Sequence, residues 1–175
     1  METLPPVVQK FILHWGEMGT KWGINRTVAQ IHALLYTSET PLHAEEICTL
    51  LGVARSNVSN SLKELQNWGI VKVVHLPGDR RDHFESMKDV YEMFRVILAE
   101  RKRREVDPTL RILNECQEEA TSDDASRYAV KRISDLQEFF QLSADFYKKM
   151  NKVPTKAAVK ALRASDKILK ALRLS

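Results

Sequence analysis

Short polar side chains recur through residues 56–63, and their chemistry suits contact with another polar molecule. Apolar positions at helical spacing, Val58, Leu62 and Leu65, predict a helix that buries one side. The opposite side then carries Ser56, Asn57, Ser59, Asn60 and Lys63. Ser and Asn are poorer helix formers than the Glu and Lys of an ordinary solvated helix. Because hydroxyl, amide and ammonium groups hydrogen-bond to phosphates and base edges, this face is a candidate DNA-contacting surface.

The residues before this stretch favour a helix-turn-helix. Residues 44–51 predict a helix, with Ile47 on its inner side and Glu45 and Glu46 near its positive N-terminal end. Gly52 then allows the sharp turn that a helix-turn-helix needs before its second helix.

The residues after it favour a β-hairpin. Residues 70–76 are rich in β-branched side chains, residues 77–79 (Pro-Gly-Asp) are typical of a turn, and residues 83–86 can pair back as a return strand. The loop carries Arg80 and Arg81, which we expect to reach an adjacent minor groove or a run of phosphates. Helix, turn, helix and hairpin together predict a winged helix.

Two further helices precede this region. The first begins at Pro5-Pro6, with an apolar side formed by Val8, Phe11, Ile12 and Trp15, and Gly16, Gly19 and Gly23 indicate where it loosens and ends. The second begins at Asn25, a good N-cap residue, runs to Tyr36 and stops before Thr40-Pro41.

The remainder of the chain is predicted to be helical. A helix begins after Lys88, and Asp107-Pro108 is expected to break or kink it. Residues 129–150 show the apolar heptad pattern of a helix that packs along another helix. Phe139, Leu142 and Phe146 widen that apolar stripe, which indicates burial on more than one side. A last helix begins near Thr155.

Positive charge is concentrated at the C-terminus. The chain of 175 residues has a net charge of +4, and residues 151–175 account for +6, which leaves −2 for residues 1–150. The last helix therefore has a basic stripe, made of Lys156, Lys160, Arg163, Lys167 and Lys170. Three interpretations stay open for this stripe, namely a solvated face of a packed helix, a contact with DNA phosphates, or a contact with a membrane surface.

Other classes of protein find little support. Cys48 and Cys116 are far apart and lack metal-ligand spacing, so we expect a reduced, cytoplasmic protein in which they are buried apolar residues or redox-sensing thiols. Residues 43–46 (His-Ala-Glu-Glu) superficially resemble a metallopeptidase motif, but no second His follows at helical spacing. No nucleophile elbow, Gly-rich phosphate loop or membrane span is apparent. We therefore expect neither an enzyme nor a metal or other cofactor.

Residues 54–65, followed by Trp68-Gly69 and the wing turn 77–84, resemble the MarR-type winged-helix transcriptional regulators, and more narrowly their GbsR-like branch. One departure is Ala54, where the family most often has Ser or Thr at the start of the recognition helix. The resemblance implies a homodimer with interlocking terminal helices, which places paired recognition helices in successive major grooves of an imperfect palindrome, usually as a repressor. The family positions that contact DNA correspond to Arg55, Ser56, Asn57, Ser59, Asn60 and Lys63, with Arg80 and Arg81 in the wing.

The expected fold is therefore mainly α, a winged helix-turn-helix with a small β-hairpin wing and dimerisation helices at both ends. We assign residues 1–23 to N-terminal dimerisation, 24–87 to DNA binding, and 88–175 to a C-terminal dimerisation region with a basic tail. Relatives in the GbsR-like branch include choline sensors. Because aromatic faces attract quaternary ammonium groups, Trp15, Trp22 and Tyr36 are candidate effector-binding residues, with core packing as the alternative. The competing functions are a winged helix that binds a protein and an architectural DNA-binding protein with little sequence preference.

Overall fold

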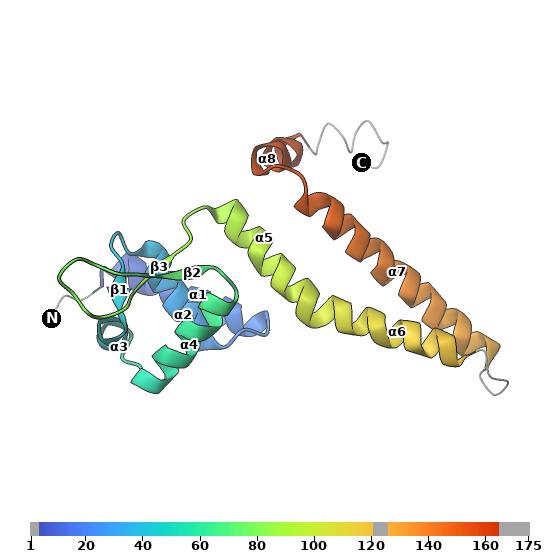
Figure 1. The fold of residues 1–175 in the computed structure, drawn as a ribbon, viewed down its shortest axis with the longest axis horizontal. Helices are drawn as coiled ribbons and strands as arrows, with labels where there is room; N and C mark the ends of the chain where they lie inside the picture. Colours follow the sequence, from blue (N-terminus) through green and yellow to red (C-terminus); the bar gives the residue numbers. More distant parts are fainter. Residues whose placement is uncertain (1–3, 121–125, 165–175) are drawn as a thin grey trace. The chain divides into compact units, whose positions relative to one another are not determined.

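The computed structural model describes residues 4–120 and 126–164. Within them the chain is mostly helical with one small antiparallel sheet, so the predicted fold class is confirmed. The chain divides into two compact units, Met1–Val96 and Ile97–Ser175. The first contains the sheet and helices α1 to α4, and the second contains most of the C-terminal helices (Figure 1).

Helices α1 (Pro6–Lys21) and α2 (Arg26–Thr37) pack against each other. Both begin where the sequence predicts, and the Asn25 side chain accepts a hydrogen bond from the Thr27 N–H at 2.8 Å. The expectation that α1 loosens at Gly16 and Gly19 is wrong, because both glycines are buried within a continuous helix. A Cβ atom at Gly19 would lie 2.5 Å from the Cβ of Ala29, so the missing side chain is what lets the two helices approach closely.

Helices α3 (Ala44–Leu51) and α4 (Arg55–Asn67) form the predicted helix-turn-helix. Gly52 joins them at a φ of 64°, a left-handed conformation that glycine adopts without a Cβ clash. The inner sides of these helices meet α2 in the core, whose fully buried side chains include Ile31, Leu34, Leu35, Ile47, Val58 and Leu65.

The wing is a three-stranded antiparallel sheet of order β1-β3-β2. Strands β2 (Val71–Val74) and β3 (His83–Ser86) form the predicted hairpin, with Val73 opposite Phe84. The third strand, β1 (Leu42–His43), was not predicted, and it pairs Leu42 with Phe84 on the other side of β3. It ties the residues just before α3 to the wing.

The predicted break at Asp107-Pro108 does not occur. Helix α5 (Val90–Arg101) continues through a π-helical segment, η1 (Lys102–Val106), into α6 (Asp107–Glu119), so the backbone stays helical past the proline. Pro108 lacks an N–H and its ring would press on the carbonyl four residues earlier in a regular α-helix. The wider π-helical turn lies just before the proline, where it gives the ring more room.

The second unit also contains α7 (Arg127–Asn151) and α8 (Thr155–Arg163), which begin close to their predicted positions. Helix α7 packs along α6 (Figure 1). Its buried residue is Ala144. Three apolar side chains on another side of α7 stay exposed, with Phe139 62%, Leu142 69% and Phe146 64% accessible to solvent. Helix α7 thus has two apolar sides. One side packs within the chain, and the other is exposed.

Candidate nucleic-acid interface

Helix α4 presents the polar face that the sequence predicts. Val58, Ser61, Leu62 and Leu65 are buried against the core. The opposite side is exposed and brings together Ser56, Asn57, Ser59, Asn60 and Lys63. Ala54 occupies the N-cap position, and no side chain caps this end of the helix. The face therefore offers hydroxyl, amide and ammonium groups on one rigid element.

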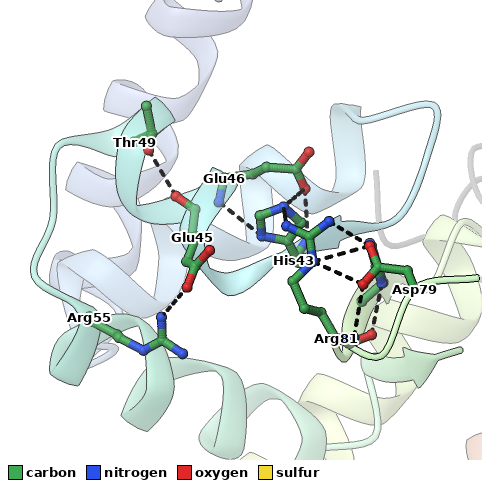
Figure 2. Close-up of polar contacts among 8 residues, drawn as sticks. His43, Glu45, Glu46, Thr49, Arg55, Asp79 and Arg81 are labelled. Carbon is green, nitrogen blue, oxygen red and sulfur yellow. Dashed lines mark hydrogen bonds and ion pairs between the residues drawn. The ribbon is translucent and has the colours of Figure 1, made fainter. Parts of the chain in front are cut away.

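Arg55, in the first turn of α4, is held by the preceding helix. Its Nη1 donates to Oε1 of Glu45 on α3 at 2.7 Å, and both side chains are largely exposed (Figure 2). The hydrogen bond and charge of Arg55 lower the pKa of the Glu45 carboxyl. In an exposed position such a pair adds little stability. Its main effect is to orient the guanidinium beside the polar face of α4.

The two wing arginines have different surroundings. Arg80 is exposed, and its side chain makes no hydrogen bond or ion pair within the described ranges. Arg81 turns back onto Asp79, with Nε 2.9 Å from Oδ1 and Nη2 2.5 Å from Oδ2. The Arg81 side chain and N–H hold the pKa of the Asp79 carboxyl well below its usual range. Of the two arginines, only Arg80 therefore projects from the loop as an unengaged cation.

A second contact ties Arg81 to the helix-turn-helix, and sequence reasoning missed it. Nη1 of Arg81 lies 2.8 Å from Nε2 of His43, the N-cap residue of α3 (Figure 2). Nδ1 of His83 lies 3.0 Å from the backbone oxygen of Arg81 and can donate to it. The spacing of His43 and Glu46 is that of a capping box, which was a usable signal for the cap. No sequence signal indicates a contact with a residue 38 positions away.

Arg55 and Arg81 border a common hollow of about 200 Å³ between the start of α3 and the wing. His43, Glu45, Asp82 and Phe84 complete most of its lining. The acidic side chains offset the two arginines, so the hollow itself is not strongly cationic. The cationic groups available to a partner are at its rim and on α4.

The three candidate effector-binding aromatics are not brought together as one set. Trp15 and Trp22 make an edge-on contact, with ring centroids 6.3 Å apart. Tyr36 instead lies beside His32, also at 6.3 Å. Trp22 is exposed while Trp15 and Tyr36 are half-buried. A shared aromatic surface therefore involves the two tryptophans.

Other candidate chemistry is sparse in the described part of the chain. Cys48 and Cys116 are free thiols and half-buried. Residues 4–120 and 126–164 contain no cluster of three His, Cys, Asp or Glu side chains able to hold a metal ion. No helix in those ranges has the length and apolar character needed to cross a membrane. Of the basic stripe near the C-terminus, Lys156 and Lys160 are exposed on α8, and residues 165–175 lie outside the described ranges.

A helix-turn-helix with an exposed polar second helix, followed by an arginine-bearing hairpin, defines a winged-helix protein. Residues 22–82 match the family model described as "MarR family". The protein thus has a MarR-like winged-helix fold, and the matched segment runs from the end of α1 to the wing. A search of the curated proteins gave no significant match.

One solved structure of the comparison supports the same fold, and two others align less well. A structure described as a transcriptional regulator superposes with a TM-score of 0.66 at 15% identity, covering 83% of this chain and 96% of its own. A mutant of S. aureus MepR bound to an oligodeoxyribonucleotide aligns with a TM-score of 0.40 at 13% identity, covering 77% of this chain and 91% of its own. For a structure of MarR the values are 0.37, 17%, 74% and 90%.

Proposed function

We propose that this protein is a sequence-specific, double-stranded DNA-binding transcriptional regulator of the MarR type. The exposed polar face of α4 carries the proposal, because it holds hydrogen-bonding groups of the kind that read base edges in a major groove. The contacting residues we propose are Arg55, Ser56, Asn57, Ser59, Asn60 and Lys63 on α4, with Arg80 and Arg81 in the wing. This activity is binding, without an enzymatic step.

These residues divide into two roles. Asn side chains pair bidentately with adenine in the major groove, so Asn60 is proposed to read sequence. Arginine contacts with phosphates give affinity that is independent of sequence and sensitive to salt, so Arg80 is proposed to supply affinity. The unengaged state of the exposed Arg80 side chain within the described ranges favours this role.

We further propose a homodimer that acts as a repressor on a palindromic operator. Residues 1–23 and 88–175 would supply its dimerisation helices, and residues 24–87 its DNA-binding domain. The exposed apolar side of α7 supports the C-terminal part of this assignment, since exposed apolar side chains gathered on one side of a helix mark an interaction surface. Assignment to the GbsR-like branch belongs to the same proposal.

A ligand response is the last part of the proposal. A choline-like cation on the faces of Trp15 and Trp22 would change the separation of the paired recognition helices and so their fit to successive half-sites. Choline titrated into the protein should change its tryptophan fluorescence and its affinity for operator DNA. Saturable fluorescence change without any effect on DNA affinity would count against a regulatory ligand.

The main test is fluorescence anisotropy with a duplex enriched by the protein from a random-sequence library, compared with a shuffled duplex. We expect selective binding that weakens steeply with added salt. Equal affinity for both duplexes would indicate an architectural DNA-binding protein. The absence of binding to either duplex would favour a winged helix that binds a protein.

The two proposed roles are tested on the same pair of duplexes. Asn60→Ala should weaken binding to the enriched duplex more than to the shuffled one. Arg80→Ala should weaken both and reduce the salt slope by about one. If the two variants lose the same factor on both duplexes, the division between sequence reading and affinity is wrong.

A further inference from the structure

The guanidinium of Arg81 is held from two sides and still has donors to spare. Arginine carries five N–H groups. Asp79 takes the Nε donor and one Nη2 donor, and His43 lies 2.8 Å from Nη1. One N–H on each terminal nitrogen is left, and the Arg81 side chain remains 53% exposed. Arg81 can therefore contact a phosphate or a groove without giving up its contacts within the protein.

The ring of His43 cannot serve both of its neighbours. The Glu46 N–H lies 3.3 Å from Nδ1, as in a helix cap, and Arg81 Nη1 lies 2.8 Å from Nε2. A neutral imidazole has only one nitrogen that accepts, whereas the guanidinium is always protonated and can only donate. Nε2 can therefore accept from Arg81 only when the ring proton is on Nδ1, whereas Nδ1 can cap α3 only when the proton is on Nε2. The shorter distance, 2.8 Å against 3.3 Å, favours the contact with Arg81.

A residue needed only to cap α3 would not have to be histidine. Ser, Thr, Asp and Asn are the good N-caps, and their short side chains reach the first turn but not the wing. The other half of the capping box persists, since the His43 N–H donates to Glu46 Oε2 at 2.8 Å. The imidazole can thus reach Arg81 as well as the first turn of α3.

The surroundings of this contact make it more than a surface pair. The His43 side chain is 11% exposed, and the His83 ring lies 5.5 Å away on β3. Glu46 Oε2 is 3.5 Å from His43 Nε2, and the neighbouring acidic residue Glu45 is paired with Arg55. Figure 2 shows Arg81 reaching from the wing to His43 at the N-cap of α3. A hydrogen bond with little solvent around it is stronger than an exposed one.

We propose that His43 is a positioning residue for the wing arginine, holding Arg81 in the orientation in which it meets DNA. This inference rests on the DNA-binding function proposed above. An arginine that is already ordered loses less side-chain freedom on binding, so its contact contributes more affinity. The N-cap residue of α3 then fixes the wing arginine relative to the reading helix α4.

Two substitutions separate the positioning role from the capping role. The amide oxygen of Asn can replace Nδ1, so H43N keeps the cap of α3 and loses the contact with Arg81. The amide oxygen of the longer Gln can replace Nε2, so H43Q keeps the contact and loses the cap. We expect H43N to bind the enriched duplex about threefold to tenfold more weakly than wild type, the range set by one hydrogen bond. H43Q should bind like wild type.

Thermal unfolding and a double-mutant cycle complete the test. H43N should unfold at the temperature of wild type or above, and H43Q below it, so weakened binding by H43N is not a folding defect. R81A with H43N should bind no more weakly than R81A alone, because His43 acts through Arg81.

The possible results separate a failure of this inference from a failure of the proposed DNA-binding function. No preference of the wild-type protein for the enriched duplex overturns both. Selective binding by wild type that H43N leaves unchanged, or additive losses in the double variant, overturns only the role of His43.

Discussion

His32 is an ionisable side chain buried inside the winged-helix unit. It lies on α2 with 4% of its surface exposed, and its Nε2 has no hydrogen-bond partner among the described residues. Burial lowers the pKa of His32 to about 4, because the charged imidazolium would lose its hydration without gaining a partner. The folded state therefore keeps the ring neutral over a pH range in which the unfolded chain protonates it.

We expect the free energy of unfolding to fall as the pH is lowered from 6.5 towards 4. The unfolded chain binds a proton at His32 from about pH 6.5 downward, whereas the folded chain does so only near pH 4. The full loss is on the order of 3 kcal/mol. Urea unfolding at several pH values should show this slope in wild type and a shallower one in His32→Leu. Carboxylates titrate in both proteins, so equal slopes would mean that His32 is not the cause.

Lys88 holds the C-terminal end of α2 from a position far along the chain. Its Nζ donates to the backbone oxygens of Leu35 and Tyr36 at 3.1 Å and of Ser38 at 2.8 Å. These oxygens lie at the negative end of the helix dipole, where a cation is favourable. The lysine thus links the segment after β3 to a core helix.

Lys88→Met should lower the free energy of unfolding by about 1 kcal/mol, because it keeps the aliphatic stem and removes the ammonium donors. Lys72→Met is the matched control, since the Lys72 side chain is 71% exposed and pairs with Glu85 at 3.3 Å. The control should change stability by about 0.5 kcal/mol or less. Chemical denaturation of both variants measures the difference, and equal losses would assign no special role to Lys88.

At the scale of elements, the packing of α1 on α2 depends on two glycines with different neighbours. A Cβ at Gly19 would meet the Cβ of Ala29 at 2.5 Å, and neither atom can rotate away. A Cβ at Gly16 would meet Cγ of Gln30 at 2.7 Å, which belongs to a flexible side chain that can move. Alanine substitution at each of these two glycines therefore compares a rigid contact with one that can adjust, within the same helix interface.

Gly19→Ala should destabilise the protein by about 1–3 kcal/mol, because the helices must separate to admit the methyl group. Gly16→Ala should change stability by less, since alanine favours a helix interior by about 1 kcal/mol over glycine and Gln30 can yield. Thermal unfolding of the two variants compares them directly. A larger loss for Gly16→Ala would contradict this reading of the interface.

Helix boundaries were predictable where local chemistry sets them. Asn25 as an N-cap, Gly52 as a left-handed turn and the apolar spacing of Val58 and Leu65 each act within a few residues, so the sequence shows them. Strand β1 has two residues, too few for a period-two pattern, and exists because β3 pairs with it. Long-range pairing of that kind leaves no local signal.

In the candidate DNA-binding site, too, local features were predictable from the sequence and long-range contacts were not. The polar face of α4 followed from helical periodicity, and the structure brings its side chains to one exposed side. Arg80 and Arg81 look equivalent in the sequence, but the contacts of Arg81 with Asp79 and His43 distinguish them. The sequence indicates that His43 caps α3, but it does not indicate the contact with the wing, because that contact arises only when β1 and β3 pair.

At the scale of the whole molecule, the exposed apolar side of α7 bears on the oligomeric state of the protein in solution. Phe139, Leu142 and Phe146 are spaced by three and four residues, so they share one side of the helix, and each is more than half exposed. A second chain offers the same side and can cover it by symmetry. A dimer formed in this way also supplies the paired recognition helices that a palindromic operator needs.

Phe146→Glu should therefore convert a dimer into a monomer, because burying a carboxylate in an apolar contact costs several kcal/mol. Sedimentation equilibrium should give twice the 20.1 kDa chain mass for wild type and the single mass for the variant. Gln141→Glu adds the same charge to an exposed polar position of α7 and should remain dimeric. The monomeric variant should also lose affinity for a two-half-site duplex, since it binds one half-site at a time. A wild-type protein that sediments as a monomer at micromolar concentration, or a dimer unaffected by Phe146→Glu, would show that this side of α7 does not join two chains.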